Sequence, residues 1–146
     1  MEISVEKVSA AVPVAVLSTH GDIDASNFMD LVKAAQAAYQ EGFHDLLLDL
    51  SDSPFLSSSG LVALHSIALL MRGEMPLDPS SGWDAIHAME RNLENGVQEH
   101  VKLLNPQPRV ERTLERTGLS MFFQMFNDKT EALASYRPES TQTTAA

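Results

Sequence analysis

The sequence predicts an α/β domain in which four or five helices pack against an open mixed β-sheet of about five strands. Two observations carry this prediction. Apolar runs typical of strands alternate along the chain with segments whose apolar residues recur every three or four positions, as on one face of a helix. The 146 residues are 44% hydrophobic and 21% charged, which is a composition suited to one globular core.

A hairpin and a central strand are expected in the first part of the chain. Residues 3–8 alternate apolar and polar side chains, and residues 14–17 form a second apolar run after a break at Pro13. These two runs predict a pair of neighbouring strands. Residues 46–50 are almost continuously apolar, which is typical of a parallel strand that is buried in the middle of a sheet.

Two helices flank that central strand. The first follows Asp24 or Ser26, either of which can accept hydrogen bonds from free helix amides, and it runs to about Gln40 with Gly42 as its stop. The second is predicted over residues 61–71. Its side chains are apolar on nearly every side, so most of it must be buried or covered by a partner.

The second half of the chain predicts one more βα unit, a strand and a last helix. The expected segments are an irregular excursion at about 74–100 with a short helix inside it, a strand over 101–104, a helix from Pro108 to Gly118, a strand over 121–126, and a helix capped by Asp128. We expect residues 1–137 to form one domain that contains this excursion. Residues 138–146 are expected to be a mobile tail.

The charge and the residue types exclude several classes of protein. Twenty acidic residues against ten basic ones give a formal net charge of −10, which repels nucleic acids and anionic membrane surfaces. The chain has no cysteine and its start does not resemble a signal peptide, so a cytoplasmic protein is expected. The histidines lack metal-site spacing and no phosphate-binding glycine loop is present, so we expect neither a metal ion nor a cofactor.

The candidate working site is the serine cluster at residues 57–59, just before the apolar helix. The start of a helix carries unpaired amides and about half a positive charge, so it stabilises an anion without help from lysine or arginine. A phosphate on Ser58 would fit this position. The alternative is that these serines only cap the helix, which is the usual role of serine there.

Three segments together resemble the STAS domain of bacterial anti-sigma-factor antagonists. They are residues 21–24 (Gly-Asp-Ile-Asp), residues 49–51 (Asp-Leu-Ser) and residues 55–61 (Phe-Leu-Ser-Ser-Ser-Gly-Leu). The resemblance covers residues 3–72 and resumes over 101–136. Members of this family carry a phosphorylatable serine before a helix, in the sequence Asp-Ser-Ser-Gly-Leu or Asp-Ser-Thr-Gly-Leu. Ser58 stands at the acceptor position, and Ser57 replaces the acidic residue that precedes it.

The resemblance implies a binding protein rather than an enzyme. It implies that the unmodified chain binds an anti-sigma factor that is itself an ATP-dependent serine kinase, and that phosphorylation of Ser58 releases this partner. A phosphatase then resets the switch. We expect a monomer or a weak homodimer. The residues expected to take part in partner binding are Asp22, Asp24, Ser57, Ser59, Gly60 and Leu61.

Other interpretations stay open. Asp24 can serve either as a helix cap or beside the acceptor serine, and the excursion can be a partner-specific lid or a tolerated surface insertion. The alternative function is a STAS scaffold that is never phosphorylated, such as a subunit of a larger signalling or transport assembly. A serine hydrolase is disfavoured because Leu56 occupies a position where the Gly-x-Ser-x-Gly elbow needs glycine.

Overall fold

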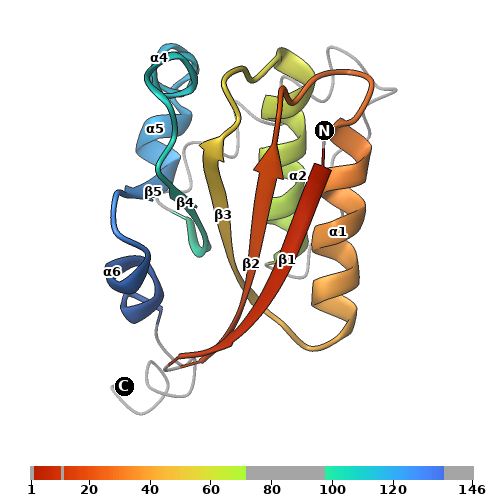
Figure 1. Cartoon of the computed structure of the whole chain (residues 1–146), viewed down its shortest axis with the longest axis vertical. Coiled ribbons are helices and arrows are strands. Elements are labelled where there is room, and N and C mark those ends of the chain that lie inside the picture. The colour runs from red at the N-terminus through yellow and green to blue at the C-terminus, as the bar shows by residue number, and fades with distance from the viewer. Residues whose placement is uncertain (1, 11, 72–97, 137–146) are drawn as a thin grey trace.

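The sheet has five strands in the order β1-β2-β3-β4-β5. The structure is a computed structural model that describes residues 2–10, 12–71 and 98–136. Its strands are β1 (Glu2–Ser9), β2 (Pro13–His20), β3 (Asp45–Asp52), β4 (Gln98–Leu104) and β5 (Phe123–Phe126). The first two strands pair antiparallel and every later pair is parallel (Figure 1), so the predicted open mixed sheet is confirmed.

Five helices are found in the described residues. They are α1 (Phe28–Gln40), α2 (Ser58–Met71), α4 (Pro108–Thr117), α5 (Leu119–Phe122) and α6 (Lys129–Ala134). Figure 1 shows α1 and α2 behind the sheet, and α4 and α5 on the side of β4 and β5, away from α1. Within the ranges that the structure describes, no helix has the length and apolar character needed to cross a membrane.

The strands bury side chains on both faces of the sheet. In β3, Leu46 and Leu48 join the large core under α1 and α2, whereas Leu47 points to the opposite face and joins a smaller core under α6. The hydroxyl of buried Tyr136 donates to the carbonyl oxygen of Leu46 at 2.5 Å and fastens the chain after α6 to the central strand. Burial raises the pKa of Tyr136, so this hydroxyl remains a donor.

Most of the predicted elements are confirmed, and one segment is corrected. Gly42 and Gly118 follow their helices with positive φ angles of 101° and 83°, as expected of helix stops. The stretch 121–126 was expected to be one strand, but Met121 and Phe122 belong to α5 and only the last four residues are extended. After Gly118 the chain turns at once into this short helix, which buries Leu119 and Phe122 together.

The boundaries of the predicted excursion change at one end. The strand expected over 101–104 begins at Gln98, because residues 98–100, the last ones assigned to the excursion, belong to β4. The rest of the excursion, including its expected short helix, and the tail over 138–146 lie outside the described residues. The domain limits of 1–137 therefore stay a prediction.

Candidate functional site

The residues singled out by the sequence lie in two loops at one edge of the sheet. Strands β2 and β3 pair in parallel, so their carboxyl ends lie at the same edge. The loop after β2 leads into α1 and the loop after β3 leads into α2 (Figure 1). In open α/β sheets, ligands bind outside the carboxyl ends of the strands. The topology thus gathers the candidate residues where such folds usually bind.

Two backbone hydrogen bonds join these loops. The amide of Ile23 donates to the carbonyl oxygen of Phe55 at 3.0 Å, and the amide of Ser57 donates to that of Ile23 at 2.9 Å. They form a one-residue parallel bridge between Ile23 and Leu56, whose side chains are both buried. The bridge places residues 22–24 beside the chain that enters α2.

The start of α2 uses its serines for different purposes. The helix begins at Ser58 rather than at the predicted residue 61, and Ser57 fills the N-cap position. The Ser57 hydroxyl oxygen accepts from the amide of Gly60 at 3.2 Å, and its carbonyl oxygen accepts from the amide of Leu61 at 3.0 Å. Ser58 is exposed, and its hydroxyl makes no hydrogen bond within the described residues. Ser57 is therefore the capping residue, whereas the Ser58 hydroxyl is open to solvent. Ser59, the next residue, is partly exposed.

Gly60 is buried against the bridge between the loops. A Cβ atom at this position would lie 2.4 Å from Cδ1 of Leu56 and 3.1 Å from Cγ2 of Ile23, so only a hydrogen atom fits without movement. Leu61 is also buried in the core. Both residues therefore shape the start of α2, and their expected contact with a partner stays a prediction.

Asp24 does not cap α1, contrary to one of its two expected roles. The N-cap of α1 is Asn27, which makes no side-chain capping bond, and Ser26 does not cap the helix either. One carboxylate oxygen of Asp24 accepts from the hydroxyl of Ser26 at 2.5 Å and from its amide at 2.9 Å. These two bonds, the hydroxyl more than the amide, hold the pKa of Asp24 below its ordinary value. The loop therefore presents a carboxylate that stays ionised.

Removal of the Ser26 hydroxyl is expected to raise the pKa of Asp24. Ser26→Ala deletes the strongest hydrogen bond to the carboxylate. Because the folded-state pKa lies below the unfolded one, the stability from Asp24 is present above the unfolded pKa and is lost as the pH falls through the folded pKa. In Ser26→Ala this contribution to stability should be smaller, and its loss should be complete at a higher pH than in the wild type. An NMR titration of the Asp24 carboxyl carbon measures the pKa, with Ser9→Ala as control, and identical curves for both variants would contradict the prediction.

The comparisons with known proteins identify the family. Residues 3–74 match the family model of the STAS domain. The chain carries a STAS domain. No curated protein matches the sequence at a significant level.

Solved structures share the fold of this STAS domain. An anti-sigma factor antagonist from Mycobacterium paratuberculosis is 23% identical, with a TM-score of 0.64 over 94% of both chains. The anti-sigma factor antagonist SpoIIAA in its unphosphorylated form is 16% identical, with a TM-score of 0.51 over 99% of both chains. The Bacillus cell fate determinant SpoIIAA in its phosphorylated form is also 16% identical, with a TM-score of 0.51 over 90% of this chain and 96% of that one. At these identities the likeness is one of fold.

A third loop borders the site of this STAS domain and was missed from the sequence. The guanidinium carbon of Arg109 lies 5.3 Å from the centre of the Phe55 ring, within the range of a cation–π contact. The side-chain amide of Gln107 donates to the carbonyl oxygen of Ser51 at 2.8 Å. The start of α4 therefore packs against the segment that leads to Ser58. No local pattern could reveal this contact, because its two sides are far apart in the sequence.

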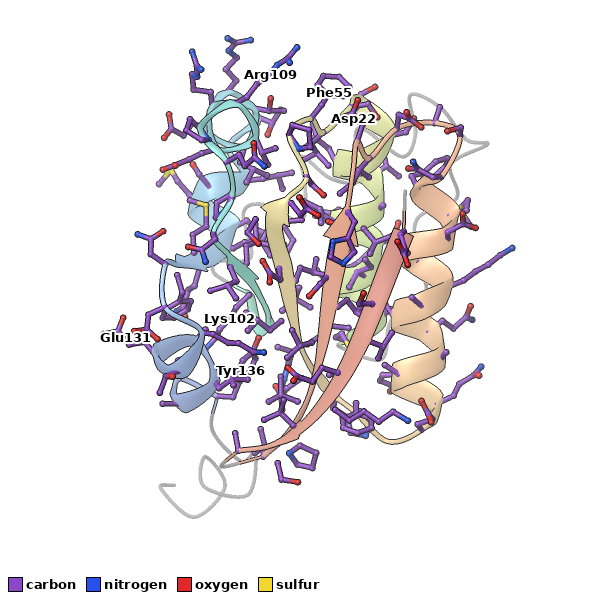
Figure 2. The ribbon with its side chains drawn as sticks, viewed as in Figure 1. Asp22, Phe55, Lys102, Arg109, Glu131 and Tyr136 are labelled. Carbon is purple, nitrogen blue, oxygen red and sulfur yellow. The ribbon has the colours of Figure 1, made fainter. Side chains whose placement is uncertain are left out.

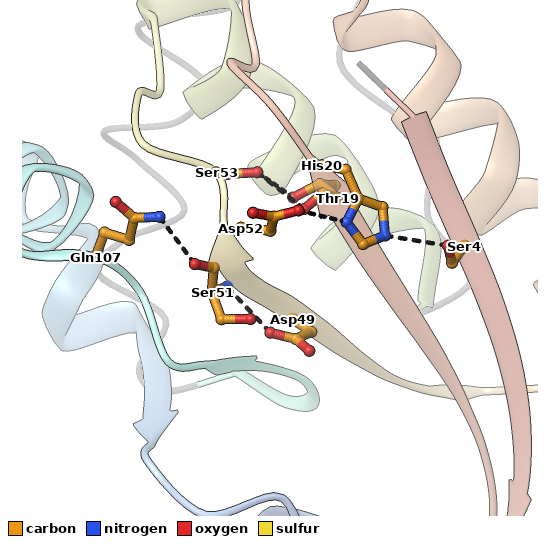
Figure 3. A network of polar contacts seen from close by, with 8 residues as sticks. All are labelled: Ser4, Thr19, His20, Asp49, Ser51, Asp52, Ser53 and Gln107. Atoms are coloured by element: carbon orange, nitrogen blue, oxygen red, sulfur yellow. Dashed lines mark hydrogen bonds and ion pairs between the residues drawn. The ribbon is translucent and has the colours of Figure 1, made fainter.

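Two sets of polar contacts, one exposed and one buried, tie the ends of the first strands together near the site (Figure 3). Nδ1 of His20 lies 2.7 Å from a carboxylate oxygen of Asp52, and its Nε2 lies 3.1 Å from the hydroxyl of Ser4. The buried hydroxyls of Thr19 and Ser53 lie 2.5 Å apart. The exposed contacts link a serine, a histidine and an aspartate, as in the catalytic triad of a serine hydrolase. However, the Asp52 side chain is 71% exposed, whereas catalytic triads lie in sites that exclude water. We interpret the network as a clamp between strands.

The described part of the STAS domain offers little for a metal ion. No group of three or more histidine, aspartate or glutamate side chains gathers there in a way that could hold one. His65, which lies on the apolar helix, is fully buried in α2 and stacks on Phe122 with ring centres 5.2 Å apart. It therefore occupies a core position.

Proposed function

We propose that this STAS domain is an anti-sigma-factor antagonist whose binding to an anti-sigma factor is switched by phosphorylation of Ser58. The observation that carries the proposal is the exposed hydroxyl of Ser58 in the first turn of a buried helix, which forms no hydrogen bond with the described part of the chain. Ser57, the neighbouring hydroxyl, is already used as the cap. The solved structures of SpoIIAA in phosphorylated and unphosphorylated forms support a switch of this kind on this fold.

The chemistry at Ser58 is a transfer of phosphate from ATP. The serine oxygen attacks the γ-phosphorus, the new oxygen–phosphorus bond forms as the bond to ADP breaks, and the hydroxyl proton is released. The product carries about −1.5 to −2 charges at neutral pH. The amino terminus of α2 stabilises that charge through its free amides and the helix dipole, so the domain itself tolerates the phosphate.

The same charge is poorly tolerated in an interface. A partner that packs against the start of α2 in the unmodified protein would have to bury a dianion after phosphorylation, next to the carboxylates of Asp22 and Asp24. Release of the partner is therefore favoured over a complex with a buried phosphate. In this proposal the partner is an anti-sigma factor with serine kinase activity, and the domain itself catalyses nothing. A phosphatase removes the phosphate by hydrolysis, and the cycle takes place in the cytoplasm.

The proposal is tested with the anti-sigma factor kinases encoded in the same genome. Each purified kinase is incubated with the full chain and ATP, and the intact mass of the chain is measured. One kinase is expected to add a single phosphate to the wild type and to Ser59→Ala, and none to Ser58→Ala. Equal phosphorylation of Ser58→Ala, or no phosphorylation of the wild type by any of these kinases, would refute the proposal.

A second candidate function rests on the residue before the acceptor. Ser57 stands where the family motif carries an acidic residue, and here it is committed to capping α2. A STAS scaffold that is never phosphorylated would use the same edge for a constitutive contact in a larger signalling or transport assembly. The mass measurement separates the two, because a scaffold binds its partner without gaining phosphate when ATP is present.

A further inference from the structure

Helix α4 carries a stripe of three arginines. Arg109, Arg112 and Arg116 follow one another at spacings of three and four residues, which places them on one side of the helix. All three are exposed, whereas Val110 and Leu114 on the other side of α4 are buried in the core. The helix thus turns a stripe of arginines to the solvent, with the exposed Glu111 and Glu115 beside it.

This arginine stripe stands out in a protein of net charge −10. The described residues contain seven lysines and arginines, and three of them lie on this one helix face. Lys7 and Lys129 form ion pairs with Glu41 and Glu6, and Lys102 is buried. None of the stripe arginines lies within ion-pair distance of a carboxylate in the described ranges. Their charges are available to a partner.

The stripe begins at the proposed phosphorylation site. Arg109 stacks on Phe55, which lies three residues before Ser58. On the other side of the same loop lies the acidic segment with Asp22 and Asp24. Figure 2 shows Arg109, Phe55 and Asp22 together along the upper edge of the molecule. The start of α2 therefore lies between a basic flank and an acidic flank.

We propose that the arginine stripe of α4 is a docking surface for an acidic segment of the protein partner that binds at Ser58. This inference rests on the proposed function, because it concerns the same partner. Arginine forks bind carboxylates in a bidentate way, and opposite charges on two flanks fix the orientation of a partner and speed its encounter. The stripe spans about 10 Å of helix, enough for a few carboxylates. A long polyanion such as DNA would meet the repulsion of the remaining acidic surface.

The test compares two charge reversals in the full chain. Arg112→Glu and Lys33→Glu make the same change in net charge at exposed helix positions, and Lys33 lies on α1 at the other side of the fold (Figure 1). Association with the anti-sigma factor kinases is followed by stopped flow at low and high salt. Arg112→Glu is expected to lower the association rate about tenfold at low salt, and Lys33→Glu less than about twofold. The difference should shrink at high salt, because screening removes it.

The outcomes separate this inference from the proposed function. Equal rates for both reversals, together with release of the kinase by Ser58→Asp, would overturn the docking surface and leave the phosphorylation switch standing. Absence of any kinase binding by the wild type would overturn both. Fluorescent duplex DNA and phosphatidylserine vesicles serve as further probes. Binding of either to the wild type, lost in Arg112→Glu, would show that the stripe serves another class of partner and would also overturn the inference.

Discussion

Replacement of Ser58 by aspartate is expected to weaken binding of the anti-sigma factor about 100-fold, or about 3 kcal/mol. The carboxylate introduces a charge where the proposed interface covers an exposed hydroxyl, and an unpaired charge in an interface costs several kcal/mol. The dissociation constant is measured by isothermal titration calorimetry without ATP. Ser58→Ala is expected to bind as the wild type does, because it adds no charge.

Two controls distinguish loss of binding from loss of the fold. An acidic residue in the first turn of α2 interacts favourably with the helix dipole, so Ser58→Asp should unfold at the same or slightly higher urea concentration than the wild type. Ser9→Asp adds the same charge at an exposed position at the other end of the sheet and should leave affinity unchanged. Full affinity of Ser58→Asp would contradict the prediction and with it the placement of the partner on α2.

The elements that sequence reasoning placed correctly are those governed by local patterns. The apolar run in β3 predicted its burial, because a strand covered on both faces needs apolar residues at every position. The uniformly apolar surface of α2 likewise predicted that it lies in the core. Glycines after α1 and α4 marked the ends of these helices, since their positive φ angles are unfavourable for other residues.

The start of α1 shows how a local pattern can mislead. Asp24 and Ser26 are both good capping residues, but their side chains bond to each other in a turn that precedes the helix. Asn27 then becomes the N-cap without a capping bond, and its side chain braces the loop by donating to the carbonyl oxygen of Asp22 at 2.9 Å. The sequence identified the residues of this loop but not the hydrogen bonds that they form.

Contacts between distant segments lay beyond prediction. Lys102 sits in a strand and is 4% exposed, because Ser135 supplies a carbonyl and a hydroxyl oxygen to its ammonium group and the Tyr136 ring lies 4.5 Å away. The contact of Arg109 with Phe55 is of the same kind. Both depend on how α4 and α6 pack against the sheet, and no spacing in the sequence carries that information.

Replacement of Gly60 by valine is expected to destabilise the protein by about 2 kcal/mol. The added atoms would collide with the side chain of Leu56. The backbone of Leu56 is held in place by its bridge to Ile23. Urea denaturation measures the free energy of unfolding. Ser59→Val places the same branched side chain one residue earlier, where the site is partly exposed, and should cost about 0.5 kcal/mol.

A double-mutant cycle shows whether Leu56 is the cause. Gly60→Ala adds only the Cβ atom that would lie 2.4 Å from Cδ1 of Leu56, and Leu56→Ala removes the atom it meets. The cost of Gly60→Ala should therefore fall by about 1 kcal/mol in the Leu56→Ala background. Additive effects would mean that α2 can shift away from the bridge. In that case the Leu56 side chain would not fix the start of α2, and the two backbone hydrogen bonds of Ile23 alone would hold the loop with Asp22 and Asp24 beside it.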